Sequence, residues 1–154
     1  PFREIYESVD WPVIILLGAM IPVGQAFETT GGAQMIASAL LSFPAHLSPT
    51  VVLIILLVAT MSLSDLINNA ACAVLMAPIA ISLASGLGVS ADPFLMATAI
   101  GASCAFLTPI GHQSNALVMG PAGLRFGDYW RMGLPLEMII VAVAVPSILY
   151  FWPL

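Results

Sequence analysis

The chain has 154 residues, of which 60% are hydrophobic and only 7% are charged, and its formal net charge is −5. A soluble domain carries roughly 25% charged residues, so this composition indicates an all-α integral membrane protein. Only three residues are Lys or Arg, which excludes a nucleic-acid-binding surface, because such surfaces need clustered basic residues. Cys72 and Cys104 lie in apolar runs and are interpreted as reduced, small hydrophobic side chains.

The first part of the chain predicts a polar linker, one span and one short helix. Residues 1–10 are polar and predict a cytosolic linker, followed by a membrane domain over 11–154. Residues 11–27 are apolar and just long enough to span a membrane. Residues 28–32 break that helix, and 34–43 are apolar but too short to cross, which predicts a helix along the interface. The chain begins without Met, and we expect it to be the C-terminal part of a longer protein.

The stretch SLSDLINNAACAVLMAPI (residues 62–79) predicts a helical hairpin over about 50–87. Two apolar arms, 50–66 and 70–87, are joined at Asn68-Asn69. Polar side chains crowd the junction between the arms: Ser62, Ser64, Asp65, Asn68 and Asn69. A polar turn between two apolar arms is typical of a hairpin that enters and leaves the membrane on one side.

A second interruption predicts a broken helix over about 93–121. Residues 94–107 are rich in small side chains, and TPIGHQSN (108–115) interrupts them before 116–120 resume the helix. Ala97, Gly101 and Ala105 recur at the spacing that lets transmembrane helices pack closely.

The end of the chain predicts an amphipathic interfacial segment over 123–133 and a last span over about 134–152. The positive-inside rule puts Arg3, Arg125 and Arg131 in the cytoplasm, which requires an even number of crossings between them. The number of crossings is an even number when residues 34–43 lie along the membrane interface and the hairpin is re-entrant. The C-terminus then lies outside.

The two breaks together predict a site for a cation and a small anion. Irregular backbone at membrane depth is tolerated only where it is buried in protein or lines a wet cavity. Freed carbonyls, with hydroxyl and amide oxygens, suit a hard monovalent cation such as sodium. Freed N–H groups and a positive helix end suit an anion. Ser-His-Asp, Cys-His and zinc-ligand spacings are absent from the sequence, which does not favour an enzyme.

The polar residues of the hairpin also have purely structural interpretations. Asn68-Asn69 can form an Asx turn or cap a helix. Ser62 and Ser64 can donate to a carbonyl of the preceding turn.

The remaining polar residues have alternatives as well. An intramembrane acid such as Asp65 is functional by default, although it can instead stay solvated in a wet vestibule. His112 can be a satisfied polar residue rather than a ligand. A further group of polar residues is interpreted as interfacial: Gln25, Glu28, Gln34, Asp92 and Glu137.

Two motifs resemble those of a known family. LINNAACAVLMAPIA (66–80) resembles the hairpin-tip motif of the divalent anion:sodium symporters, the citrate-transporter-like permeases of the ion transporter superfamily. GASCAFLTPIGHQSNALVMGP (101–121) resembles their second motif, a broken helix with a T-P-x-G or T-P-P-N loop. Residues 3–24 and GLRFGDYWRMGLPLE are also similar, so the resemblance covers nearly the whole chain.

The resemblance implies a fold and a set of ligands. The chain would be most of the second of two inverted repeats, with a scaffold span, an interfacial helix, a re-entrant hairpin, a discontinuous helix and the final span. Of the family's Ser-Asn-Thr tip, only the central Asn is retained here. The implied sodium ligands are Ser64, the Ile67 carbonyl, Asn69 and the Gly111 carbonyl. The implied substrate-binding residues are Asn68, Asn69, Ala70, His112, Gln113, Ser114 and Asn115.

We therefore expect a secondary transporter that moves a small divalent anion, such as a dicarboxylate or sulfate, with sodium by alternating access. Its expected partners are the N-terminal half of the same transporter, membrane lipid and a second copy in a homodimer, and its expected location is the inner (plasma) membrane, as a multi-pass protein. One alternative is a cation/proton antiporter or arsenite-type permease, in which Asp65 carries the proton. Asp65 and His112 can also support coupling to protons instead of sodium, since both can titrate when perturbed. Another is a structural membrane subunit without a site.

Overall fold

The computed structural model of the chain describes residues 11–41 and 47–154, and every regular element in these two ranges is a helix. The predicted all-α class is therefore confirmed. The expected linker over 1–10, with Arg3, lies outside the described residues, as does the end of the expected 34–43 helix. The helices are α2 (Trp11–Thr29), α3 (Gly32–Leu41), α4 (Pro49–Ser64), α5 (Asn69–Leu87), α6 (Asp92–Ala102), α7 (Gln113–Met119) and α8 (Phe126–Phe151).

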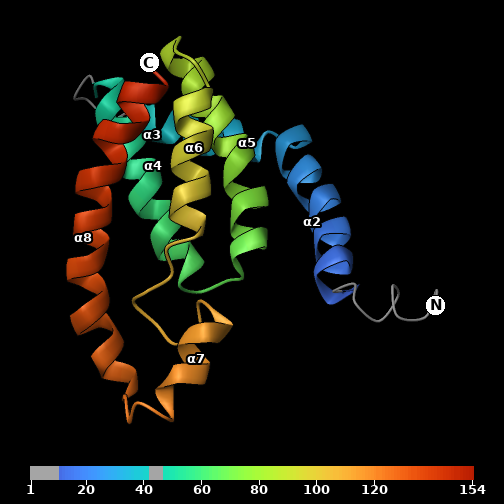
Figure 1. Cartoon of the computed structure of the whole chain (residues 1–154). Helices are drawn as coiled ribbons and strands as arrows, with labels where there is room; N and C mark the ends of the chain where they lie inside the picture. The colour runs from blue at the N-terminus through green and yellow to red at the C-terminus, as the bar shows by residue number, and fades with distance from the viewer. Residues whose placement is uncertain (1–10, 42–46) are drawn as a thin grey trace, which may run out of the picture.

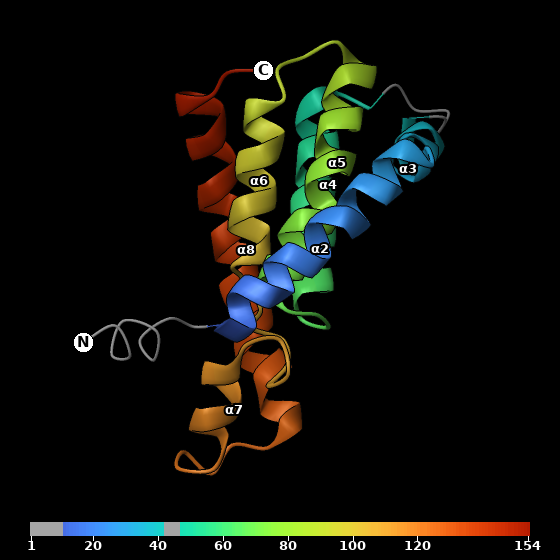
Figure 2. The same cartoon turned by 90° about the vertical axis from the view of Figure 1, so that its right-hand side faces the viewer.

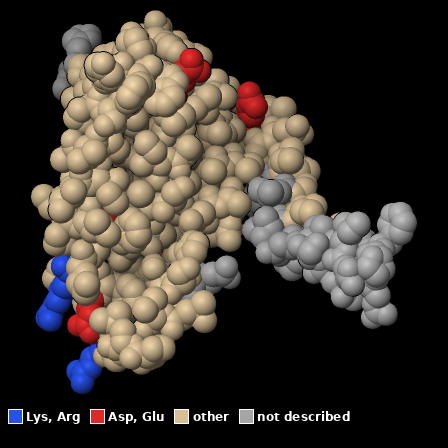
Figure 3. All heavy atoms as spheres, viewed as in Figure 1, with Lys and Arg blue, Asp and Glu red and all other residues tan. Residues whose placement is uncertain are grey.

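Two of the described helices, α5 and α8, are long and apolar enough to cross a membrane, and α4 is a shorter apolar helix. On the face shown in Figure 3, charged side chains gather near the two ends of the molecule. The surface between those ends is almost entirely uncharged. This distribution fits a protein whose middle lies among lipid chains rather than in water.

Helices α4, α5, α6 and α8 pack together and form the body of the molecule (Figure 1). Helix α6 packs against α4, α5 and α8, and α4 also contacts α5 and α8. Helix α2 crosses α5 obliquely, and α3 packs on α5 at the end of the body that lies away from α7 (Figure 2). Helix α7 lies beyond the other end, next to the turn that joins α4 to α5.

The core forms where α4 and α6 approach closely. Buried apolar side chains of α4, α5 and α6 fill it, among them Leu57, Leu83 and Phe94. A Cβ atom added to Gly101 would lie 2.9 Å from the Cβ of Thr60 and 3.0 Å from the carbonyl oxygen of Leu57. The stripe of small residues in α6 therefore allows the close packing predicted from its spacing.

Local capping explains why α4 and α5 form an antiparallel pair. Pro49 begins α4 directly after its N-cap Ser48, where proline is well tolerated. Asn68 accepts a hydrogen bond from the backbone N–H of Ala70 (2.9 Å) and so caps α5. Gly88 ends α5 in the left-handed conformation, with a φ of 70°. The structural interpretation of Asn68 as a cap is therefore confirmed.

The last helix differs from its prediction. Residues 126–133 of the interfacial segment expected over 123–133 form one helix, α8, with the span expected from 134. The helix begins earlier because the carboxylate of Asp128 accepts a hydrogen bond from the backbone N–H of Arg125 (2.8 Å), which stabilises the first turn. Pro135 lies inside the continuous helix and does not end it.

Candidate functional site

The two polar breaks of the chain meet in the folded structure. The first is the turn over residues 65–68, and the second is the irregular segment over 103–112, which runs from α6 to α7 (Figure 1). The hydroxyl of Thr108 donates to the backbone carbonyl of Asp65 (2.7 Å), and the backbone N–H of Leu107 donates to the Asp65 carboxylate (2.9 Å). These two hydrogen bonds hold the breaks together.

Ser64 lies at the centre of a cluster of oxygen atoms. Its hydroxyl oxygen is 3.0 Å from the side-chain oxygen of Asn69 and 2.7 Å from the backbone carbonyl oxygen of Ala102. A hydroxyl has one hydrogen and can donate to only one of these acceptors at a time. Ser64 is fully buried, at 0% exposure. Three oxygens that share one hydrogen in a buried position make an environment that suits a hard monovalent cation.

The carbonyl of Ala102 is the member of this cluster that the sequence did not predict. The helix predicted over 94–107 ends at Ala102 instead, so this carbonyl is left without a partner in the next turn of the helix. Helix α6 can end early because of a tertiary contact: the Ser64 hydroxyl donates to the Ala102 carbonyl in place of the missing backbone N–H.

The residues that carry the other two predicted sodium ligands, the carbonyls of Ile67 and Gly111, lie close to the end of α4. A Cβ atom added to Gly111 would be 3.0 Å from both the carbonyl oxygen of Ser64 and the Cα of Asp65, so the backbone of Gly111 approaches the end of α4 closely. Ile67 lies in the turn between Ser64 and Asn69, and its side chain packs against the hydrophobic core.

A polar cavity of about 430 Å³ adjoins the oxygen cluster. The residues that line it come from the start of α5, the 103–112 segment and α7: Asn69, Ser103, Ala105, Phe106, His112, Ser114 and Asn115. Four predicted substrate-binding residues are thus brought together, while Ser103, Ala105 and Phe106 were not predicted. Asn68 and Ala70 are not among its lining residues, and the side chain of Gln113 lies outside the described part of the structure.

The wall of this cavity is held by hydrogen bonds from α7 and α8. The ring nitrogen Nδ1 of His112 accepts from the backbone N–H of Ser114 (3.2 Å), which caps α7. The side-chain amide of Asn115 donates to the backbone carbonyls of Ala105 (2.7 Å) and Thr108 (3.2 Å). The phenol of Tyr129 in α8 donates to the backbone carbonyl of Asn115 (2.6 Å). Tyr129 therefore ties the last helix to the cavity.

The structure corrects the sequence-based placement of two acidic residues, Asp65 and Glu137. Asp65 is only 3% exposed, so it does not stay solvated in a vestibule. Glu137, expected at the interface, is buried in α8 at 9% exposure. Glu137 is buried because Gly133, one turn earlier, lets α8 approach the backbone of Phe106 closely. A Cβ atom added to Gly133 would overlap the carbonyl of Phe106.

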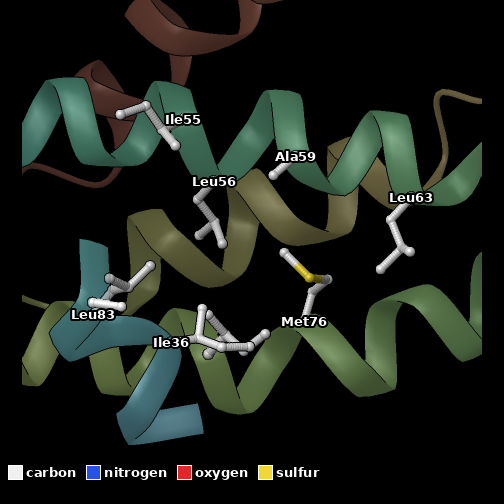
Figure 4. A pocket seen from close by; sticks show the side chains of 9 residues that line it. Ile36, Ile55, Leu56, Ala59, Leu63, Met76 and Leu83 are labelled. Atoms are coloured by element: carbon white, nitrogen blue, oxygen red, sulfur yellow. The ribbon is translucent and has the colours of Figure 1, made fainter. Parts of the chain in front are cut away.

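A second cavity has a different character (Figure 4). It measures about 530 Å³ and lies between α3, α4 and α5. Apolar side chains line it, among them Ile36, Leu56, Met76 and Leu83. Without polar atoms to replace a hydration shell, this cavity does not suit an ion.

Comparison with known proteins identifies the family. The family model of the citrate transporters matches residues 1–101 and, in a second alignment, 53–154. The uncharacterized transporter YfbS of Escherichia coli (strain K12) is 39% identical over 151 residues, which cover 98% of this chain and 25% of that protein. Sodium/sulfate cotransporter 2 of Chlamydomonas reinhardtii is 30% identical over 139 residues, covering 90% of this chain and 16% of that protein.

A mammalian relative points the same way. Solute carrier family 13 member 2 of Oryctolagus cuniculus is 30% identical over 149 residues, covering 96% of this chain and 25% of that protein. The chain thus spans a quarter or less of the length of each of these three relatives. Nearly all of it takes part in each match, including both breaks. The chain belongs to the citrate transporter family.

Proposed function

We propose that the chain is part of a secondary transporter that moves a small divalent anion, such as a dicarboxylate or sulfate, together with sodium. The observation that carries the proposal is the buried oxygen cluster around Ser64 beside a polar cavity of about 430 Å³, with Asn69 belonging to both. A relative of this chain is named a sodium/sulfate cotransporter.

The cation half of the site would use neutral oxygens. We assign to sodium the hydroxyl of Ser64, the side-chain oxygen of Asn69 and the carbonyls of Ile67 and Gly111, and we add the carbonyl of Ala102. Neutral oxygen ligands suit a monovalent cation, because they replace its hydration shell without adding charge.

The anion half would use the cavity. Its volume lies in the range of small-molecule sites, which is about 300–1,000 Å³. We assign substrate contacts to the residues named from the sequence: Asn68, Asn69, Ala70, His112, Gln113, Ser114 and Asn115. The described Arg residues, Arg125 and Arg131, are not among those that line the cavity. A sodium ion at Ser64 would therefore supply nearby positive charge, and anion and cation would bind cooperatively.

The helices around the site support the proposed membrane arrangement. Helix α4 has 16 residues, about 24 Å at 1.5 Å per residue, which is shorter than the roughly 30 Å hydrocarbon core of a bilayer. We propose that α4 and α5 form a re-entrant hairpin, that α6 and α7 are the halves of a discontinuous helix, and that α8 is the last span. The domain over 11–154 would then be one inverted repeat, with α3 at the interface.

Transport would proceed by alternating access. The hydrogen bonds from Leu107 and Thr108 to Asp65 join the hairpin to the broken helix, so both would move as a unit. The rest of the transporter, including its N-terminal half and a second copy in a homodimer, would provide the surface against which this unit moves in the inner (plasma) membrane.

Uptake by the full-length transporter in proteoliposomes tests this function. Labelled succinate, citrate and sulfate are offered with and without an inward sodium gradient at fixed pH. The proposal expects sodium-dependent uptake of at least one of them. Uptake that ignores sodium would overturn the coupling, and uptake of none of the three would remove this substrate class.

A proton-coupled permease is the second candidate, because one carboxylate oxygen of Asp65, Oδ2, is buried without a hydrogen-bond partner. In that case uptake follows a proton gradient, and Asp65→Asn abolishes it. Full activity of Asp65→Asn would remove this candidate.

A further inference from the structure

Asn115 is one of the residues assigned to the anion, yet both hydrogens of its side-chain amide are already donated. The amide nitrogen donates to the backbone carbonyls of Ala105 (2.7 Å) and Thr108 (3.2 Å). An asparagine amide has two N–H donors, so the wall of the cavity uses both of them. Since a carbonyl oxygen can only accept, these two contacts also fix which end of the amide is nitrogen. While they hold, Asn115 cannot donate to a carboxylate or a sulfate.

The side-chain oxygen of Asn115, Oδ1, is the group that remains for a ligand. Among the described residues none donates a hydrogen bond to Oδ1, and it is not one of the unpartnered atoms that are sealed in the interior. The backbone of Asn115 is held as well, because its carbonyl accepts from the phenol of Tyr129 (2.6 Å). Oδ1 is therefore an accessible acceptor on a residue whose position is fixed at both ends.

Two other residues that line the polar cavity offer donors. Oδ1 of Asn69 is 3.0 Å from the Ser64 hydroxyl oxygen, which leaves the amide N–H groups of Asn69 for the cavity. Nδ1 of His112 accepts from the backbone N–H of Ser114 (3.2 Å), so the neutral ring carries its hydrogen on Nε2 and can donate there. The cavity thus combines donors, which suit carboxylate oxygens, with an acceptor, which suits a hydroxyl group.

Asn115 also borders a smaller cavity of about 210 Å³ beside α8. Apolar side chains such as Leu124, Met132 and Leu136 line much of it. Its volume lies below the range of small-molecule sites, about 300–1,000 Å³, whereas the polar cavity of about 430 Å³ lies within it. The polar cavity is therefore the better place for a ligand of Oδ1.

We propose that Asn115 selects anions that carry a hydroxyl group. Its Oδ1 accepts a hydrogen bond from the hydroxyl of a hydroxylated dicarboxylate such as malate, while Asn69 and His112 donate to carboxylate oxygens. Succinate has the same carbon chain without the hydroxyl, and sulfate has no hydrogen to donate at neutral pH. A site built to pair with a hydroxyl disfavours both, because its acceptor is then left unpaired. This inference rests on the proposed function and narrows its substrate class to hydroxy acids.

Calorimetric binding to the purified full-length transporter, with sodium present, tests this selection without measuring transport. The probes are malate, succinate and methylsuccinate, whose methyl group occupies the place of the hydroxyl but has no hydrogen to donate. One hydrogen bond corresponds to a difference of about threefold to tenfold in affinity, so we expect malate to bind more tightly than the other two acids by that factor. Malate that binds no more tightly than succinate or methylsuccinate would overturn the proposal.

Two variants test whether the preference resides at Asn115. Asn115→Leu removes Oδ1 and should abolish the preference for malate over succinate. Ser103→Ala is the matched control and should keep the preference, because Ser103 lines the same cavity but its hydroxyl donates to the carbonyl of Ala99 in α6 (2.9 Å). A preference that survives in Asn115→Leu contradicts the assignment. If Asn115→Leu does not fold, the three acids compared on the wild type decide alone.

The uptake assay separates this inference from the proposed function. Equal binding of malate and succinate, together with sodium-dependent uptake, removes only the role of Asn115. Binding of none of the three acids also overturns the inference, and uptake of sulfate then shows whether the proposed anion transport stands without it.

Discussion

The side-chain oxygen of Asn69 lies 3.0 Å from the hydroxyl oxygen of Ser64, across the turn that joins α4 to α5. The two residues are on different helices and meet only when that turn is formed. Because the same hydroxyl also reaches the carbonyl of Ala102 at the end of α6, the contact joins three helix ends. Formation of the proposed cation site is therefore linked to the folding of both breaks.

Asn69→Ala tests the residue that the oxygen cluster and the cavity share. The change removes one proposed sodium ligand and one donor to the anion, so we expect uptake to fall more than about tenfold. A tenfold fall corresponds to a loss of ~1.4 kcal/mol of binding free energy. The fold should survive, because Asn69 is only partly buried. Uptake and the thermal unfolding midpoint are measured on the same preparation. Normal uptake would show that Asn69 is not part of the site.

Gly111→Ala tests the close approach of the two breaks. The added methyl group would lie 2.7 Å from the Cβ of Ala105 and 3.0 Å from backbone atoms of Ser64 and Asp65, which have little room to move. We expect a destabilisation of about 1–3 kcal/mol, as for other overpacked sites, and a loss of sodium-dependent uptake. The matched control is Gly120→Ala, because a Cβ at Gly120 meets no atom within 4 Å. Equal melting temperatures for both variants would contradict the close approach.

Tyr129→Phe tests the link from α8 to the cavity wall. It removes the hydrogen bond to the carbonyl of Asn115 (2.6 Å) and keeps the ring. We expect a higher KM for the anion with a smaller change in kcat, and a stability loss of about 0.5–1.5 kcal/mol. The control Tyr150→Phe changes a tyrosine that is 81% exposed at the far end of α8. If both variants have the same KM, Tyr129 does not position the cavity.

Much of the hairpin could be predicted because its signals are local. The apolar arms and the polar junction at Asn68-Asn69 are visible in the sequence, and the structure ends α4 at Ser64 and begins α5 at Asn69. Capping by Asn68 depends on its own side chain and the next two residues. Such short-range chemistry does not need the rest of the fold.

The features that the sequence did not predict depend on tertiary contacts. The carbonyl of Ala102 is a backbone group in an apolar run, and nothing in its neighbours shows that the helix ends there. The burial of Glu137 depends on the approach of α8 to Phe106 at Gly133. A lone acid near Pro135 has the same local pattern at an interface and in a core, so composition could not distinguish them.

Direct binding of radioactive sodium to the purified full-length transporter tests the central claim most directly. The variants are Ser64→Ala and Ser62→Ala, on the same helix, because the Ser62 hydroxyl is exposed and donates to the carbonyl of Val58 in its own helix. We predict that Ser64→Ala weakens sodium binding by about tenfold or more, while Ser62→Ala binds like the wild type. Equal sodium affinity in Ser64→Ala and the wild type would contradict a cation site at the junction of the two breaks.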